Sequence, residues 1–246
     1  KTYLTATMPK PCMYLTFDPN ALNGVNDQIV SGAIKAEDIP YLSFDDGDYR
    51  EVAMAYKDPT NPFGLESIYK ETPFKTLVLD SLTSWFKLAL TYAIELSRTY
   101  GLKEQPTIER PQLVGYGIRS TATKEMAFNL INWCRKHGVN CVFIAHKGEM
   151  VKDEQTGIMY NSIGLSGDIP NEIARWCDEC WMMGVDGTGK RLLQVQPLSN
   201  ARPLKTRMFS SDVSTVDATT LSLSQLIDAW RSAGKINNDT LTHLKG

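Results

Sequence analysis

Three short apolar runs, each followed at once by a polar side chain, constrain the fold of this chain more than any other feature. The runs are residues 12–17, 76–79 and 141–145, and they are followed by Asp18, Asp80 and His146. Apolar runs of this length, separated by helical segments, are typical of buried strands in a parallel sheet. We therefore predict an α/β fold with a largely parallel central sheet flanked by helices.

The segments between these runs carry helical signals. Apolar residues at helical spacing predict a helix over residues 82–98. A second helix, capped by Thr121 or Thr123, is expected to run to His137, with Gly138 at its C-cap. Shorter helices are expected over residues 2–8, 27–36, 47–56, 170–176 and 223–232. Both long helices thus fall between the second and third apolar runs, where a parallel sheet requires a crossover connection.

Near the C-terminal end, the pattern changes from parallel to antiparallel. Residues 181–184 and 192–195 are strand-like and flank the turn signal at residues 186–189, which predicts an antiparallel hairpin. Residues 184–190 also match the glycine and lysine spacing of a phosphate-binding loop. However, Arg191 stands where that motif needs Ser or Thr, and a strand follows instead of a helix. We interpret the segment as a hairpin turn.

Composition indicates one globular domain over residues 1–246. The chain has 246 residues, of which 42% are hydrophobic and 22% are charged, and its formal net charge is -2. That length suits one α/β domain, in which residues 21–73 form an insertion or peripheral helices and residues 210–246 a C-terminal linker and helix. No global positive field attracts nucleic acid, so DNA binding would depend on local basic loops.

The five cysteines lack the spacing of a disulfide framework, and they favour reduced thiols in a cytosol. Cys177 and Cys180 form a CxxC pair, but no second pair or histidine lies near them in sequence. Buried thiols are the favoured interpretation. The sequence also contains no apolar run of membrane-spanning length and no recognisable signal peptide, which favours a cytoplasmic protein without membrane partners.

The first two residues could belong to a phosphate-binding loop. Such loops place a lysine on the terminal phosphates and a Ser or Thr hydroxyl on Mg²⁺ at the start of a helix. Lys1 and Thr2 precede a short helix and a buried strand, so they would be the last two residues of that loop, with its glycines outside this sequence. A Lys-Thr pair by itself is common, and its significance depends on the polar residues later in the chain.

The polar residues after the apolar runs each have a functional and a structural interpretation. Asp80 fits a Walker B carboxylate that holds Mg²⁺, although acids often end strands in α/β proteins. Asp18 could orient the attacking water, or it could start a turn before Pro19. His146 could sense the γ-phosphate, or it could be structural. Later in the chain, Lys205 and Arg207 alternate on one face of an extended segment and could reach a phosphate of a neighbouring subunit, or could be solvated charges.

The serial order of these features resembles the RecA-like P-loop ATPases, and most closely the phage-encoded nucleotide-binding and single-strand annealing proteins of that fold. The matching segments are KTYLTATMPKPCMYLTFD, KTLVLDSLTSW, GYGIRSTATKEMAFNLINWCRKHGVNCVFIAHK and RPLKTRMF. The resemblance implies the cofactors ATP and Mg²⁺. It assigns nucleotide contacts to Lys1, Thr2, Asp80 and Ser81, metal binding to Thr2 and Asp80, and catalytic roles to Asp18, His146, Lys205 and Arg207.

The same resemblance implies single-stranded DNA binding by two loops, at residues 103–119 and 147–166. The candidate contacts in these loops are Lys103, Arg110, Tyr116, Arg119, Lys147 and Lys152. Cations and aromatic rings are the side chains that follow a nucleic-acid backbone and stack on bases.

The function expected from the resemblance is ATP-dependent binding, annealing or recombination of single strands, with DNA-stimulated ATP hydrolysis at the interfaces of a ring or filament. Partners would be single-stranded DNA, further copies of the chain and a single-strand binding protein, in the cytoplasm of a host cell if the chain is phage-encoded. Two alternatives stay open. One is a nucleotide-dependent scaffold with little turnover, and the other is a helicase-like motor that unwinds strands.

Overall fold

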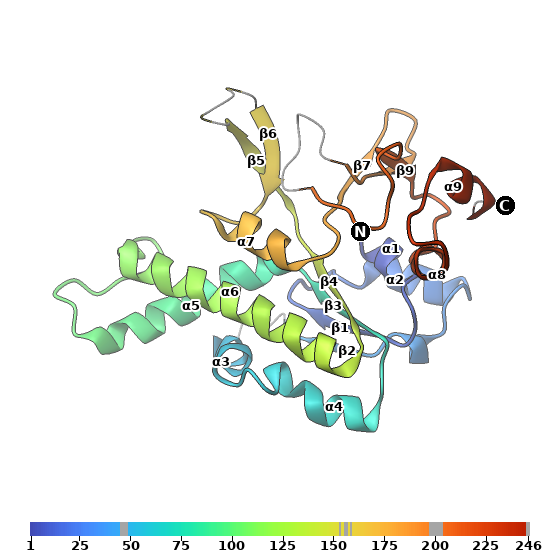
Figure 1. The fold of residues 1–246 in the computed structure, drawn as a ribbon. Coiled ribbons are helices and arrows are strands. Elements are labelled where there is room, and N and C mark those ends of the chain that lie inside the picture. The colour runs from blue at the N-terminus through green and yellow to red at the C-terminus, as the bar shows by residue number, and fades with distance from the viewer. Residues whose placement is uncertain (45–48, 153, 155–156, 158, 197–203, 245–246) are drawn as a thin grey trace. The chain divides into compact units, whose positions relative to one another are not determined.

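The computed structural model describes residues 1–44, 49–152, 154, 157, 159–196 and 204–244 (Figure 1). These residues fall into two compact units. Lys10–His146 form one unit, and Lys1–Pro9 together with Lys147–Gly246 form the other. No helix within the described ranges combines the length and the apolar character that crossing a membrane requires.

A parallel sheet forms the centre of the Lys10–His146 unit. Its strands in the described residues are β1 (Cys12–Thr16), β2 (Tyr41–Ser43), β3 (Thr76–Asp80) and β4 (Asn140–Ile144), in the order β2-β1-β3-β4 (Figure 1). All three neighbouring pairs are parallel. Every residue of β1 and β3 is buried, because these two strands lie inside the sheet. The predicted α/β fold with a parallel sheet is confirmed.

Strand β2 was not expected from the sequence. It has three residues, and Tyr41 and Ser43 at its ends are exposed, so no apolar run marks it. Main-chain pairing to β1 creates it, with Tyr14 opposite Tyr41 and Thr16 opposite Ser43. An edge strand of this kind depends on its neighbour in space, and its own side chains carry little signal.

The helices of this unit lie between its strands in the sequence. They are α2 (Asn23–Val30), η1 (Ala36–Asp38), α3 (Tyr49–Lys57), η2 (Pro62–Gly64), α4 (Leu65–Glu71), α5 (Leu82–Ser97), η3 (Arg98–Tyr100) and α6 (Gln112–His137). Figure 1 shows α5 and α6 as a long helical pair, and α3 packs against both. Trp85 and Ala89 of α5 and Met126 and Leu130 of α6 are almost completely buried, so the apolar faces of these helices supply much of the core.

Helix α6 begins earlier than predicted. It starts at Gln112 instead of Thr121 or Thr123. It ends at His137 as expected, with Gly138 as its C-cap in the left-handed conformation. A Cβ atom at Gly115 would lie 3.3 Å from both Ile94 Cδ1 and Pro111 Cβ. Gly115 therefore permits close packing, and this contact outweighs the helix-breaking signal that suggested a loop.

The second unit contains small antiparallel sheets. Its elements are α1 (Thr2–Thr5), β5 (Lys147–Lys152), β6 (Met159–Ile163), α7 (Ile169–Trp176), β7 (Met182–Val185), β8 (Arg191–Gln194), β9 (Thr215–Asp217), α8 (Leu223–Ala233) and α9 (Asn238–Leu244). Strands β7 and β8 form the predicted hairpin, and Asp186 Oδ1 closes its turn by accepting from the main-chain N–H groups of Thr188 and Lys190 at 2.8 and 3.0 Å. The match of residues 184–190 to a phosphate loop is thus coincidental.

Two expectations for this unit need correction. Residues 147–166 were expected to be a loop, but β5 and β6 pair as an antiparallel hairpin within this range. The polar segment after Arg207 was expected to be a linker before one helix, yet it contains β9, which pairs with β8, and α9 follows α8. Strands β5, β6 and β9 form because their main chains pair with a neighbouring strand. Their polar residues, taken alone, predict a loop.

The first residues of the chain belong to this second unit because they hold the start of α8. The main-chain N–H of Leu223 donates to Thr7 Oγ1 at 2.9 Å, and that of Ser224 donates to the Thr7 carbonyl at 3.0 Å. The Ser222 side chain caps the same helix by accepting from the N–H of Gln225. The first N–H groups of α8 thus have partners from a segment more than 200 residues earlier.

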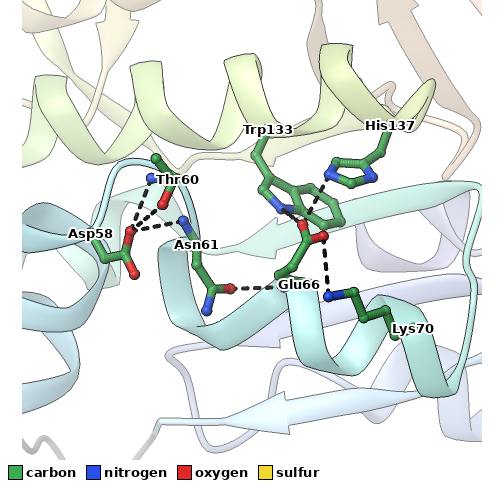
Figure 2. Close-up of polar contacts among 7 residues, drawn as sticks. All are labelled: Asp58, Thr60, Asn61, Glu66, Lys70, Trp133 and His137. Atoms are coloured by element: carbon green, nitrogen blue, oxygen red, sulfur yellow. Dashed lines mark hydrogen bonds and ion pairs between the residues drawn. The ribbon is translucent and has the colours of Figure 1, made fainter.

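Glu66 of α4 ties that helix to the end of α6 (Figure 2). Its Oε2 atom lies 3.1 Å from His137 Nε2 and accepts a hydrogen bond from Trp133 Nε1 at 3.3 Å, while Lys70 Nζ lies 3.7 Å from Oε1. The contact with His137 becomes an ion pair when the imidazole is protonated. Burial opposes ionisation of Glu66, but these neighbours outweigh it, and the pKa of Glu66 is lowered.

Turns before α4 position Glu66 for this contact. Asp58 Oδ1 accepts from the N–H groups of Thr60 and Asn61, both at 3.0 Å, and Asn61 Oδ1 accepts from the Glu66 N–H at 2.8 Å (Figure 2). This chain of side-chain to main-chain bonds fixes where α4 begins.

Replacing Glu66 with Gln is expected to destabilise the protein at neutral pH and to have less effect in acid. A carboxylate with a lowered pKa contributes stability above its ordinary pKa, and this contribution is lost as the pH falls through the pKa of the folded state. Urea unfolding of Glu66→Gln and wild type across pH 3–7 measures this difference. Glu37→Gln is the control, because Glu37 is 77% exposed and contacts Lys35 at 3.6 Å. Equal destabilisation at every pH would contradict the assignment.

Candidate active site

The candidate site lies at the carboxyl edge of the parallel sheet. Thr16 of β1 is paired with Asp80 of β3, and Asp80 is paired with Ile144 of β4, so the three strands end level. The Phe17 N–H donates to the Asp80 carbonyl at 2.8 Å, which extends the pairing one residue beyond β1. Asp18 and His146 follow two residues after the paired ends. The structure therefore brings these predicted residues to one edge, where ligands of α/β sheets commonly bind.

Asp18 is held by two serines at the start of α5. Ser84 Oγ donates to Asp18 Oδ1 at 2.6 Å, and Ser81 Oγ donates to Asp18 Oδ2 at 3.0 Å. Ser81 is also the N-cap of α5, and its Oγ accepts from the Ser84 N–H at 3.1 Å. Both carboxylate oxygens of Asp18 are thus oriented by the same helical turn.

Asp80 is a buried carboxylate at the end of β3. Asp80 is 4% exposed, and Ser81, which follows it through a cis peptide bond, is fully buried. Carboxylate and hydroxyl oxygens are the ligands that Mg²⁺ prefers. The described residues contain no group of three or more His, Cys, Asp or Glu side chains suited to a metal. A nucleotide-bound Mg²⁺ needs only one or two protein carboxylates, because phosphates and water complete its shell, and Asp80 fits that requirement.

His146 is tied to the same helical turn through its main chain. Its N–H donates to Thr83 Oγ1 at 2.9 Å, and Thr83 is 8% exposed. Thr83 and Ser84 were not among the predicted site residues. The signal for them in the sequence is the run of hydroxyl side chains at positions 81, 83 and 84, where a helix begins after a buried strand.

Lys1 and Thr2 belong to the other compact unit. Thr2 is the first residue of α1, and the Lys1 carbonyl accepts from the N–H groups of Leu4 and Thr5 at 3.0 and 3.1 Å. A helix therefore begins at these residues, as the prediction required. Their roles toward phosphate and Mg²⁺ remain predictions.

The two predicted interface cations, also in that unit, differ in their surroundings. Lys205 Nζ donates to the carbonyls of Cys177 and Arg175 at 2.7 and 3.2 Å. Arg207 forms an exposed ion pair with Asp178, at 2.8 Å. The ammonium of Lys205 is therefore engaged with the end of α7, whereas the guanidinium of Arg207 lies at the surface.

The residues predicted to contact DNA do not all lie in loops. Lys103 and Arg110 precede α6 and are exposed, but Tyr116 and Arg119 are on α6 itself. The Arg119 guanidinium lies 4.0 Å from the centre of the Phe86 ring and 5.0 Å from that of Tyr116. Burial lowers the pKa of Arg119, and these cation–π contacts are internal to the helix pair.

The remaining two, Lys147 and Lys152, are both exposed and occupy the two ends of strand β5. They therefore belong to the β5–β6 hairpin instead of an irregular loop. Exposed cations on a hairpin can still follow a phosphate backbone.

Cys177 and Cys180 are half-buried thiols after α7, and neither forms a disulfide. Burial raises the pKa of the Cys180 thiol to about 12, with the neighbouring Cys177 adding to the effect. Zinc binds the thiolate, so this environment does not favour a metal site.

Comparison with known protein families adds one result to this geometry. A family model described as AAA domain matches residues 1–207, which include both Asp18 and Asp80 and extend through Arg207. No curated protein matches the chain.

Replacing Ser84 with Ala is expected to lower the free energy of unfolding by about 2 kcal/mol, because the Asp18 carboxylate loses the hydrogen bond that the Ser84 hydroxyl donates to it. Chemical denaturation measures the change. Ser97→Ala is the matched control on the same helix, since the Ser97 hydroxyl donates only to the Ile94 carbonyl of its own turn, and we expect its effect to be close to zero. Equal effects of the two substitutions would show that the Asp18–Ser84 bond contributes nothing.

Proposed function

Because the chain belongs to the AAA domain family of P-loop ATPases, we propose that it hydrolyses ATP at the sheet edge that carries Asp18, Asp80 and His146. The observation that carries this proposal is the level ending of three adjacent parallel strands with these residues after them. The first turn of α5 fixes the Asp18 side chain and the His146 main chain at that edge.

Phosphoryl transfer depends mainly on positioning and on neutralising charge, so each residue has a limited task. In our proposal, Asp18 orients the attacking water and accepts its proton, with its carboxylate held by Ser81 and Ser84. The His146 side chain contacts the γ-phosphate and transmits its loss to the β5–β6 hairpin that comes next in the chain. Lys1 neutralises charge on the terminal phosphates.

Magnesium, when bound with the nucleotide, would supply positive charge that stabilises the negative charge developing during phosphoryl transfer. The residues that would hold it are Asp80 and the Thr2 hydroxyl, assisted by Ser81. The near-complete burial of Asp80 and Ser81 supports this assignment, because a buried, fixed carboxylate binds a cation without reorganisation.

We further propose that single-stranded DNA activates this ATPase in an oligomer, as expected for a relative of the phage RecA-like annealing proteins. Exposed Lys147 and Lys152 on β5, with half-buried Tyr160 on β6, support a backbone-tracking surface on the hairpin. Lys103 and Arg110 are exposed before α6 and would add cations. Because the net charge is -2, binding would depend on few local cations and would weaken with added salt.

The test is ATP turnover by the full chain with Mg²⁺, with and without single-stranded DNA. We expect stimulation by the strand and a loss of roughly 100-fold or more in kcat for Asp80→Ala, the size seen when one element of transition-state stabilisation is removed. Asp228→Ala is the control, because Asp228 is 68% exposed on α8 and lies 3.9 Å from Arg231.

Other outcomes would point elsewhere. Tight ATP binding without stimulated turnover would contradict the DNA-activated ATPase and support a nucleotide-dependent scaffold. ATP-driven strand unwinding would support a helicase-like motor. A complete absence of nucleotide binding would overturn the proposal.

A further inference from the structure

Glu179 accepts an unusual number of hydrogen bonds. Its Oε2 accepts from Trp181 Nε1 at 2.8 Å and Thr206 Oγ1 at 2.6 Å, and its Oε1 accepts from the main-chain N–H groups of Arg207 and Met208 at 2.6 and 2.7 Å. A carboxylate offers about four lone-pair sites. Within the described residues these four donors match that capacity, so the position of the side chain is fixed.

These bonds join two segments that are 28 residues apart in the chain. The main chains of Cys180 and Lys205 are also paired, with N–H to carbonyl distances of 2.7 and 3.0 Å in the two directions. Beyond the cation-bearing residues, Met208 and Phe209 are 3% and 1% exposed. Arg207 therefore lies between Lys205, whose main chain is paired with Cys180, and the buried residue Met208. Glu179 accepts directly from the main-chain N–H of Arg207.

The two cations of this segment suit different tasks. Lys205 donates to two carbonyls at the end of α7, where a cation stabilises the helix terminus. Arg207 forms an ion pair with Asp178, and the two side chains are 63% and 62% exposed, respectively. Exposed pairs of this kind contribute little to stability, so Arg207 can exchange Asp178 for a phosphate. Lys205 could bind a phosphate only by giving up its hydrogen bonds to the end of α7.

From this geometry we infer that Glu179 is a positioning residue, which fixes the main chain of Arg207 so that its guanidinium meets the nucleotide phosphate of a neighbouring subunit. In this inference Arg207 contacts the phosphate, and Lys205 holds the segment against the end of α7. This inference rests on the proposed ATPase function. A carboxylate is needed at position 179 because only acceptor atoms can satisfy four converging donors.

A double-substitution cycle tests the inference in the full chain, with ATP, Mg²⁺ and single-stranded DNA. Glu179→Gln keeps the shape of the side chain but replaces one acceptor oxygen with an NH₂ group. Because small displacements of a catalytic group are costly, we expect kcat to fall roughly 10- to 100-fold. KM for ATP is expected to stay near the wild-type value. In the Arg207→Ala background the same substitution is expected to have no further effect on kcat.

Asp228→Asn is the matched control, because it removes an exposed carboxylate of the same unit. Glu179→Asp provides a second variant if Glu179→Gln does not fold, since it keeps the charge and withdraws the oxygens by one methylene. Thermal unfolding of each variant identifies those that are folded at the assay temperature.

The outcomes separate this inference from the function on which it rests. If Glu179→Gln or Glu179→Asp lowers kcat by the same factor with and without Arg207, Glu179 has a general structural role and the inference is wrong. If Arg207→Ala retains full turnover, the inference is wrong while the ATPase function stands. If the wild-type chain does not hydrolyse ATP under any of these conditions, both are overturned.

Discussion

The hydrogen bonds made by the first turn of α5 are the interactions on which the candidate site depends. Ser81 and Ser84 bind the Asp18 carboxylate after β1, and Thr83 accepts from the His146 N–H after β4. Strand ends and helix starts both leave polar groups without partners inside their own element. At this edge the hydroxyl side chains of the helical turn supply the partners of the Asp18 carboxylate and of the His146 N–H. The same bonds fix the spacing of the residues proposed to act on ATP.

Packing beneath the edge supports this arrangement. Phe17 precedes Asp18 and Trp85 follows Ser84, and the two rings meet edge to face with centroids 5.6 Å apart. Phe63 contacts both rings, at 5.9 and 5.7 Å. The Asp18–Ser84 bond therefore extends an aromatic cluster, so the buried core determines the geometry of the polar site.

Carboxylates and hydroxyls alone cannot perform phosphoryl transfer, because developing negative charge also needs cations. The sheet edge supplies oxygen ligands, and Lys1, Lys205 and Arg207 belong to the other compact unit. In our proposal, Lys1 acts on the nucleotide of its own subunit and Arg207 on that of a neighbour. Such a division makes hydrolysis depend on assembly, and Glu179 would set how accurately Arg207 is presented.

The sequence by itself determined strands β1, β3 and β4, the polar residues that end them, and the β7–β8 hairpin. Each of these is encoded by neighbouring residues, either as an apolar run followed directly by a polar side chain or as a turn between two strand-like segments. Tertiary structure alone decided β2, the early start of α6 against Ile94, and the pairing of Asp18 with serines 63 and 66 residues away. It also decided the network of Glu179. Hydrogen-bond partners and close contacts that are distant in the chain leave no periodic pattern, so they are fixed only when the core brings them together.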